Sequence, residues 1–164
     1  MKPYWLNRDE GPAIWMFDAL DTIKADAEQT DGSFTLVEFL DVEGSTVPFH
    51  RSERWDRGFY VLEGQYTFYI GDDTVPAAAG AWVFVPRTTP HAWKCDSAAG
   101  RLLNLTVPGG FERFYRDVGE AVVDRGKLPS RSEPDITALS ATAAKYGITI
   151  LGPPPGAPAS EELP

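Results

Sequence analysis

Residues 44–64 read GSTVPFHRSERWDRGFYVLEG, and residues 80–95 read GAWVFVPRTTPHAWKC. These two segments contain both histidines of the chain, His50 and His91. Each histidine lies beside residues of high β-propensity, and glycine or proline bounds each run. The pattern predicts short β-strands that end in tight turns, with one histidine in each of two distant segments.

Turn-forming residues recur along the whole chain, which contains fourteen prolines and fifteen glycines. Glu63, Gly64 and Gln65 predict a hairpin that pairs residues 59–62 with residues 66–70. Many short strands separated by turn residues are typical of a β-sandwich or a small barrel, so the expected fold class is all-β. We expect strands at residues 14–17, 22–25, 34–42, 59–62, 66–70, 75–79, 81–85, 91–95 and 102–107.

The periodicity changes after Pro108. Phe111, Phe114 and Val118 recur at helical spacing, which predicts a short helix over residues 111–119. We expect a second helix over residues 135–146, which ends at Gly147. Residues 148–151 are expected either to add an edge strand or to cover the mouth of the barrel. The expected organisation is a lead-in with the first strands, a barrel core, C-terminal helices with a covering strand, and a disordered Pro-rich tail, over residues 1–33, 34–108, 109–152 and 153–164.

Composition restricts the class of protein. A chain of 164 residues with 43% hydrophobic residues is enough for one packed domain, and no apolar run approaches the ~20 residues of a membrane span. The net charge of −9 and the lack of a basic stripe argue against a nucleic-acid partner. A single cysteine, Cys95, and an N-terminus without a basic and apolar leader pattern indicate a cytoplasmic protein.

Glycine, proline and histidine positions in the two opening segments resemble the two motifs of the cupin superfamily. Gly44, His50 and Gly64 match the first motif, and the second is matched by Gly80, Pro86 and His91. The segments VPGGFERFYRDVGE and AAKYGITILGPPP are also similar to small bacterial one-domain cupins of the quercetin-dioxygenase-like group. The resemblance implies a cupin-type jelly-roll β-barrel with short C-terminal helices, a central pocket for a small organic molecule, and a homodimer.

The sequence departs from that family at the metal ligands. The resemblance implies that His50 and His91 would bind a metal, but Ser52 stands in place of a second histidine and Arg57 in place of a glutamate. A permanent guanidinium repels a dication, and two imidazoles are too few ligands for a stable site. We therefore expect no cofactor. The alternative is a divalent Fe, Mn, Ni or Zn ion held by His50, His91 and a substitute carboxylate, Glu53.

Without a metal, the same positions can serve acid–base catalysis. Arg57 would stabilise a carboxylate, enolate or phenolate, and His50 or His91 would move a proton with Ser52 as a hydrogen-bond partner. In a second interpretation Arg57 pairs with Glu53 and faces solvent. Aromatic residues are expected to form the pocket walls, with about half of them facing inward; the candidates are Phe59, Tyr66, Phe68, Trp82, Phe84 and Trp93.

These residues favour an enzyme that acts on an apolar or aromatic metabolite by cyclisation or isomerisation. A metal-dependent, dioxygenase-like cupin and a non-catalytic ligand-binding cupin remain as alternatives, because cupins serve many functions.

Overall fold

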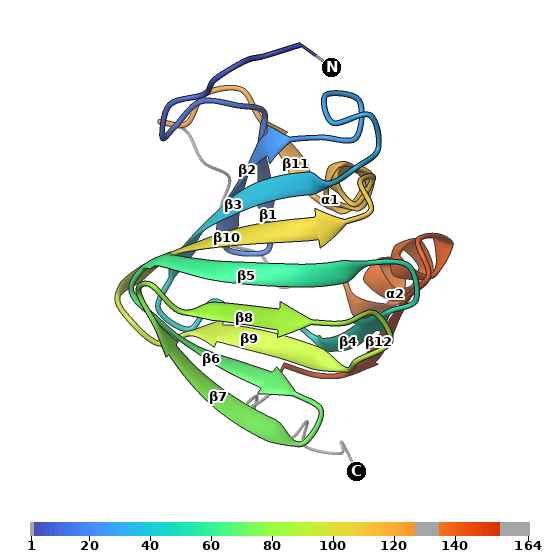
Figure 1. Ribbon diagram of the computed structural model, residues 1–164. Coiled ribbons are helices and arrows are strands. Elements are labelled where there is room, and N and C mark those ends of the chain that lie inside the picture. The colour runs from blue at the N-terminus through green and yellow to red at the C-terminus, as the bar shows by residue number, and fades with distance from the viewer. Residues whose placement is uncertain (1, 127–134, 155–164) are drawn as a thin grey trace.

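The computed structural model describes residues 2–126 and 135–154. Strands dominate the described chain (Figure 1). They are β1 (Ala13–Met16), β2 (Ala19–Ala25), β3 (Thr35–Val42), β4 (Phe49–Ser52), β5 (Asp56–Glu63), β6 (Gln65–Ile70), β7 (Asp73–Ala78), β8 (Trp82–Val85), β9 (His91–Cys95), β10 (Ala99–Val107), β11 (Glu120–Val122) and β12 (Ile148–Gly152). The two helices of the described residues are α1 (Glu112–Val118) and α2 (Ile136–Lys145).

The strands form two antiparallel sheets that face each other, as in a jelly-roll barrel. The larger sheet has seven strands in the order β11-β1-β2-β3-β10-β5-β8. The smaller sheet has five strands in the order β12-β4-β9-β6-β7. Both helices lie at the same end of the sheets (Figure 1). The predicted all-β jelly roll with short C-terminal helices is confirmed.

The connection at Gly64 differs from the predicted hairpin. Strands β5 and β6 follow each other in the chain but pair with different neighbours, β5 with β8 and β10, and β6 with β7 and β9. The chain therefore crosses from one sheet to the other at Gly64, whose φ is 86°. A Cβ atom there would lie 2.5 Å from Ser97 Oγ and 2.7 Å from Ala99 O, so only glycine fits this crossing. The expected pairing was wrong because local turn signals do not distinguish a hairpin from a crossing between sheets.

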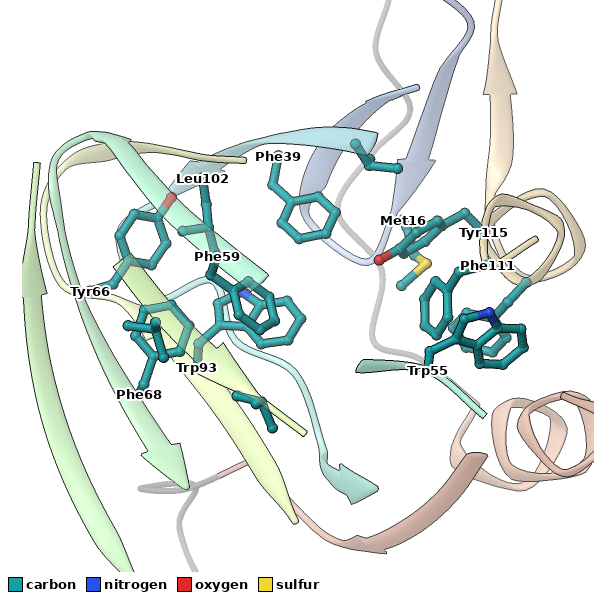
Figure 2. Packing of buried hydrophobic residues seen from close by; sticks show 14 of the residues in the cluster. Met16, Phe39, Trp55, Phe59, Tyr66, Phe68, Trp93, Leu102, Phe111 and Tyr115 are labelled. Atoms are coloured by element: carbon teal, nitrogen blue, oxygen red, sulfur yellow. The ribbon is translucent and has the colours of Figure 1, made fainter. Parts of the chain in front are cut away.

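The core lies between the two sheets and consists largely of aromatic residues (Figure 2). Phe39 of β3 stacks against Trp93 of β9, with ring centroids 5.7 Å apart. Phe59 of β5 contacts Phe68 of β6 at 5.2 Å. Each of these pairs joins the larger sheet to the smaller one, and burying such rings is the main stabilising contribution to the barrel.

The C-terminal helices close one end of the barrel. In α1, Phe114 packs edge-on against Tyr146, the residue after α2, with centroids 5.7 Å apart. Helix α2 begins after Asp135, whose carboxylate accepts hydrogen bonds from the backbone N–H groups of Thr137 and Ala138. It ends before Gly147, whose φ is 69°, as the stop signal predicts. Strand β12 lies at the edge of the smaller sheet, which confirms the predicted edge strand.

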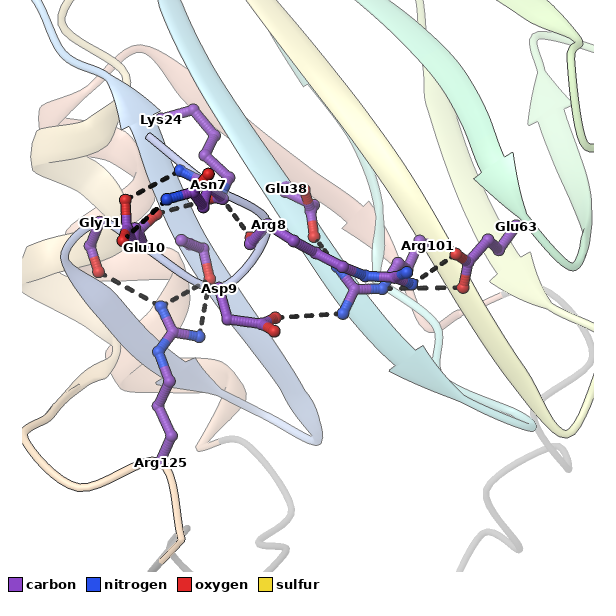
Figure 3. Close-up of polar contacts among 11 residues, drawn as sticks. Asn7, Arg8, Asp9, Glu10, Gly11, Lys24, Glu38, Glu63, Arg101 and Arg125 are labelled. Carbon is purple, nitrogen blue, oxygen red and sulfur yellow. Dashed lines mark hydrogen bonds and ion pairs between the residues drawn. The ribbon is translucent and has the colours of Figure 1, made fainter. Parts of the chain in front are cut away.

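The N-terminal arm, residues 2–12, contains no strand and is held by charged groups on the larger sheet (Figure 3). Lys24 of β2 donates to the backbone carbonyl oxygens of Asn7 and Glu10 at 2.9 and 3.0 Å. Arg101 of β10 forms ion pairs with Asp9 of the arm, at 3.3 Å, and with Glu38 of β3. The arm therefore covers part of the outer face of the larger sheet.

Neither helix of the described residues has the length and apolarity that crossing a membrane requires. The predicted disordered tail, residues 153–164, lies almost entirely outside the described residues.

Candidate functional site

The two histidines lie side by side on neighbouring strands of the smaller sheet. His50 of β4 is the register partner of His91 of β9, and their ring centroids are 4.3 Å apart. Both side chains are buried. The structure thus brings together two residues that lie far apart in the chain.

Backbone carbonyl groups determine the tautomer of both rings. His50 Nδ1 lies 2.8 Å from Pro48 O, and His91 Nδ1 lies 3.0 Å from Thr89 O. Because a carbonyl oxygen only accepts, each Nδ1 donates its proton and each Nε2 keeps a lone pair. Within the described residues, His91 Nε2 is buried without a hydrogen-bond partner.

Burial keeps both imidazoles neutral. Burial and the nearby Arg57 guanidinium lower the pKa of His50 to about 4. Burial, His50 and Arg57 together hold the pKa of His91 well below its ordinary value. At neutral pH each ring is therefore an uncharged proton acceptor at Nε2.

Arg57 of β5 lies beside His50 and is only 2% exposed. Its Nη1 lies 3.3 Å from His50 Nε2, and its Nη2 donates to Asn104 Oδ1 at 2.7 Å and to Tyr115 Oη at 2.9 Å. All three partners are uncharged, and within the described residues no carboxylate forms an ion pair with Arg57. The interpretation in which Arg57 pairs with Glu53 at the surface is therefore wrong.

Three aromatic rings surround the Arg57 guanidinium. Its carbon lies 4.7 Å from the ring centroid of Phe111, 5.0 Å from that of Phe59 and 5.1 Å from that of Trp93. These rings attract a cation through their negative faces and hold it away from water. Burial lowers the pKa of Arg57 from its usual value, but a guanidinium remains protonated at neutral pH.

These residues do not fit a metal ion. The lone pair of His50 Nε2 faces Arg57 Nη1, so a cation already lies where a metal would bind. Glu53 is exposed and pairs with Arg51 at 3.1 Å, so the expected substitute carboxylate points away from the histidines. Among residues 2–126 and 135–154, no three His, Cys, Asp or Glu side chains are grouped so as to hold an ion.

Ser52 has a structural position. Its hydroxyl accepts from the backbone N–H groups of Arg54 and Trp55 at 3.4 and 3.3 Å. It therefore stabilises the turn between β4 and β5, and the structure shows no hydrogen bond from it to either described histidine. A catalytic role of Ser52 has no geometric support.

A cavity of about 60 Å³ lies between the sheets, next to Arg57 and His50. That volume exceeds the ~15 Å³ that one water molecule needs, so the cavity admits a small ligand group. Its walls come from β1, β2, β3 and the loop before β4, and from β9, β12 and both helices. The lining residues are Met16, Phe17, Asp18, Ala19, Asp21, Phe39, Asp41, Ser45, Thr46, Val47, Pro48, His50, Arg57, Trp93, Phe111, Phe114, Tyr115, Leu139, Ile148 and Ile150.

The six predicted pocket aromatics divide into three groups. Trp93 lines the cavity. Phe59, Tyr66 and Phe68 are buried in the core away from it. Trp82 and Phe84 are 54% and 56% exposed, which corrects the expectation that they form pocket walls. Because side chains alternate along a strand, β8 turns Val83 and Val85 inward and these two rings outward.

Two cavity residues that sequence reasoning missed are the buried aspartates Asp21 of β2 and Asp41 of β3. Burial, together with the carboxyl groups of Asp41 and Asp18, raises the pKa of Asp21 well above its ordinary value, while Arg57 acts in the opposite direction. Burial raises the pKa of Asp41 to about 7, although a hydrogen bond from Tyr66 Oη opposes the shift. The available signal was an acidic residue among the apolar residues of each strand, Asp21 in ALDTIKA and Asp41 in TLVEFLDV, although TLVEFLDV contains a second acidic residue, Glu38.

Comparison with known proteins agrees with the fold. Residues 37–107 match the family model described as the cupin domain. These residues therefore form a cupin domain. The chain is 33% identical over 118 residues to quercetin 2,3-dioxygenase of Bacillus subtilis. That match covers 72% of this chain but only 35% of the relative.

Solved structures support the same fold. KdgF from a Halomonas species superposes with a TM-score of 0.61 at 16% identity, over 69% of this chain and 99% of that one. A Streptomyces protein, PAC13, determined with uridine, superposes with a TM-score of 0.57 at 23% identity, over 82% of this chain and 99% of that one. At these identities the likeness concerns the fold and not the chemistry.

Proposed function

We propose that this protein is an enzyme that binds a small aromatic or apolar organic acid, or a compound that becomes an enolate or phenolate, and acts on it by acid–base chemistry. The buried Arg57 carries this proposal. A guanidinium without a carboxylate partner is costly inside a protein, and an anionic ligand group in the adjacent cavity offsets that cost. Negative charge that develops on the ligand during reaction is stabilised in the same way.

His50 supplies the proton acceptor in this proposal. It lines the cavity, and its Nδ1 is fixed on Pro48 O, so Nε2 is the nitrogen that accepts a proton once the acid group of the ligand draws Arg57 Nη1 away from it. Trp93, Phe39 and Phe111 provide apolar walls that would hold a flat ring and exclude water. His91 does not line the cavity, and its ring packs against that of His50 with centroids 4.3 Å apart.

Proton abstraction from carbon can be tested without a known substrate. Small aromatic 2-oxo acids, such as phenylpyruvate, are incubated with the protein in D₂O, and deuterium uptake at carbon is followed by NMR. We expect uptake with the native protein and at least a ~100-fold slower rate with His50→Gln, because glutamine keeps the size but cannot take a proton. Ligand binding should survive in His50→Gln and be lost in Arg57→Met.

The result also separates an enzyme from a receptor. If acids bind in an Arg57-dependent way but no carbon acid exchanges, the ligand-binding alternative is correct and the catalytic part of the proposal fails. If no acid binds, the role of Arg57 is wrong.

A metal-dependent, dioxygenase-like function is the second candidate. It is favoured by the 33% identity to quercetin 2,3-dioxygenase and by the free lone pair at His91 Nε2. Mass spectrometry of the metal content of purified protein tests it. We expect far less than one transition metal per native chain and a gain of metal in Arg57→Glu, which replaces the cation with a carboxylate ligand. A near-stoichiometric metal in the native protein would contradict the metal-free proposal.

A further inference from the structure

The cavity lining contains three aspartates in addition to Arg57 and His50. They are Asp18 in the turn between β1 and β2, Asp21 on β2, and Asp41 on β3, and we call these three residues the carboxyl wall. All three line the cavity that Arg57 and His50 also line. The lining of this cavity therefore contains both a guanidinium and carboxyl groups.

Asp21 is the member of the carboxyl wall that lacks a hydrogen-bond partner. It is 2% exposed and lies opposite Phe39 in the β2–β3 register. In the described part of the chain, no N–H or O–H group donates to its carboxyl oxygens, although buried polar groups in proteins are nearly always paired. Asp41 differs, because Tyr66 Oη donates to its Oδ2 at 2.8 Å.

Asp21 and Arg57 interact electrostatically without forming an ion pair. The guanidinium lowers the pKa of Asp21 against the effect of burial, but within residues 2–126 and 135–154 no ion pair joins the two side chains. The buried Arg57 guanidinium and the buried Asp21 carboxyl group thus line one cavity. Among the described residues, Arg57 has no carboxylate in an ion pair and Asp21 has no hydrogen-bond donor, although burial favours such partners. A ligand that places an acid group on Arg57 and a hydrogen-bonding group on Asp21 supplies both missing partners.

We propose that Asp21 is a specificity-determining residue that receives a hydroxyl group of the ligand, so that the ligand is a small aromatic hydroxy acid with its acid group on Arg57 and its hydroxyl on Asp21. This inference rests on the proposed function, because it takes the Arg57 contact as given. The same cavity is also lined by the aromatic residues Phe39, Trp93 and Phe111, which favour an aromatic ligand.

A hydroxyl fits Asp21 better than an ammonium group does. Burial and the neighbouring carboxyl groups favour the neutral form of Asp21, and a neutral carboxyl group both donates to and accepts from a hydroxyl. An ammonium group would require Asp21 to ionise, and it would bring a second cation into a cavity that already contains Arg57. Asp18, Asp41, Arg57 and Tyr115 are the charged or titratable groups coupled to Asp21.

The test measures affinity by isothermal titration calorimetry with benzoate, its meta- and para-hydroxy derivatives, and para-(aminomethyl)benzoate. We expect one hydroxybenzoate to bind the native protein about fivefold or more tightly than benzoate, the gain typical of one net hydrogen bond. In Asp21→Leu the affinity for that hydroxybenzoate should fall to about the affinity for benzoate, while the affinity for benzoate itself stays within about twofold of the native value. The variant should fold, because it removes a buried carboxyl group and leaves no described group without its partner.

Asp41→Asn is the matched variant, since Asp41 lies on the same wall but is already bonded to Tyr66. It should keep the preference for the hydroxyl, and Asp21→Asn, which retains hydrogen-bonding atoms, should keep part of it. Equal ratios of hydroxybenzoate to benzoate affinity in the native protein and in Asp21→Leu overturn the inference, and so does tighter binding of the aminomethyl compound than of either hydroxybenzoate. If benzoate binding depends on Arg57 but no hydroxyl adds affinity, the inference fails while the proposed function stands. If no acid binds, both fail.

Discussion

At the scale of single residues, the fold stability should depend on pH through Asp41. Its pKa is about 7 in the folded protein and near 3.8 when exposed, so the folded state retains a proton that the unfolded state loses between those values. Raising the pH through this interval therefore lowers the stability of the native protein. Because the pKa of Asp41 is about three units higher in the folded protein than when exposed, the loss of folding stability above pH 7 is on the order of 4 kcal/mol.

Asp41→Asn removes this titration. Measured by urea unfolding, its stability relative to the native protein should increase from pH 4 to pH 7 and stay constant above pH 7, because asparagine cannot ionise but still accepts from Tyr66. Asp56→Asn is the control. Hydrogen bonds from Arg87 lower the pKa of the exposed Asp56 to about 2, so its contribution is complete above about pH 4 and is lost only in stronger acid. A difference for Asp41→Asn that stays flat between pH 4 and 7 would show that Asp41 is not protonated in the fold.

At the scale of secondary-structure elements, the outer face of the β5–β8 pair depends on Gly58. A Cβ atom at this position would lie 2.0 Å from Cη2 of Trp82, so the indole ring lies directly over the glycine. The register places Gly58 beside Phe84 and Tyr60 beside Trp82. This explains how β8, at the edge of its sheet, keeps a large half-exposed ring ordered on its neighbour.

A double-mutant cycle tests this contact. Gly58→Ala should lower the free energy of unfolding by about 1–2 kcal/mol, because the methyl group displaces the indole from the sheet. In a Trp82→Ala background the same change should cost nothing or stabilise by a few tenths of a kcal/mol, since alanine is less flexible than glycine in the unfolded chain. Equal costs in both backgrounds would place the defect in the backbone and not in the Trp82 contact.

At the scale of the whole molecule, Arg57 connects three parts of the barrel. It extends from β5 of the larger sheet to His50 of the smaller sheet, and it also contacts Asn104 of β10 and Tyr115 of α1. Such a position could indicate a structural role. Yet all three hydrogen-bond partners are uncharged, so removing the arginine leaves no charge behind.

Arg57→Met should therefore stabilise the protein while it abolishes binding of small acids. We expect a gain of about 1–2 kcal/mol in urea unfolding, in the range seen when buried charges are replaced by apolar groups of similar volume. A loss of stability comparable to that of a broken core contact, about 3 kcal/mol, would assign Arg57 to the fold and not to function.

The homodimer expected from the family resemblance stays a prediction.

Much of the architecture could be predicted from local patterns. Glycine and proline positions marked the strand ends, helical spacing after Pro108 located α1, and Gly147 marked the end of α2. The crossing at Gly64 could not be predicted, because a turn residue specifies a change of direction but not the sheet to which the next strand belongs. The outward position of Trp82 and Phe84 could not be predicted either, since alternation alone leaves open which face of β8 is buried.

The candidate site shows the same division. By itself the sequence determined the all-β fold class and the placement of both histidines in strand segments, because these depend on residue type and spacing along the chain. Only the tertiary structure decided that Arg57 is buried against His50, that Glu53 points outward, and that Asp21 and Asp41 line the same cavity. These are contacts between strands that lie far apart in the sequence. Packing the two sheets around one core creates them, and no local pattern contains that information.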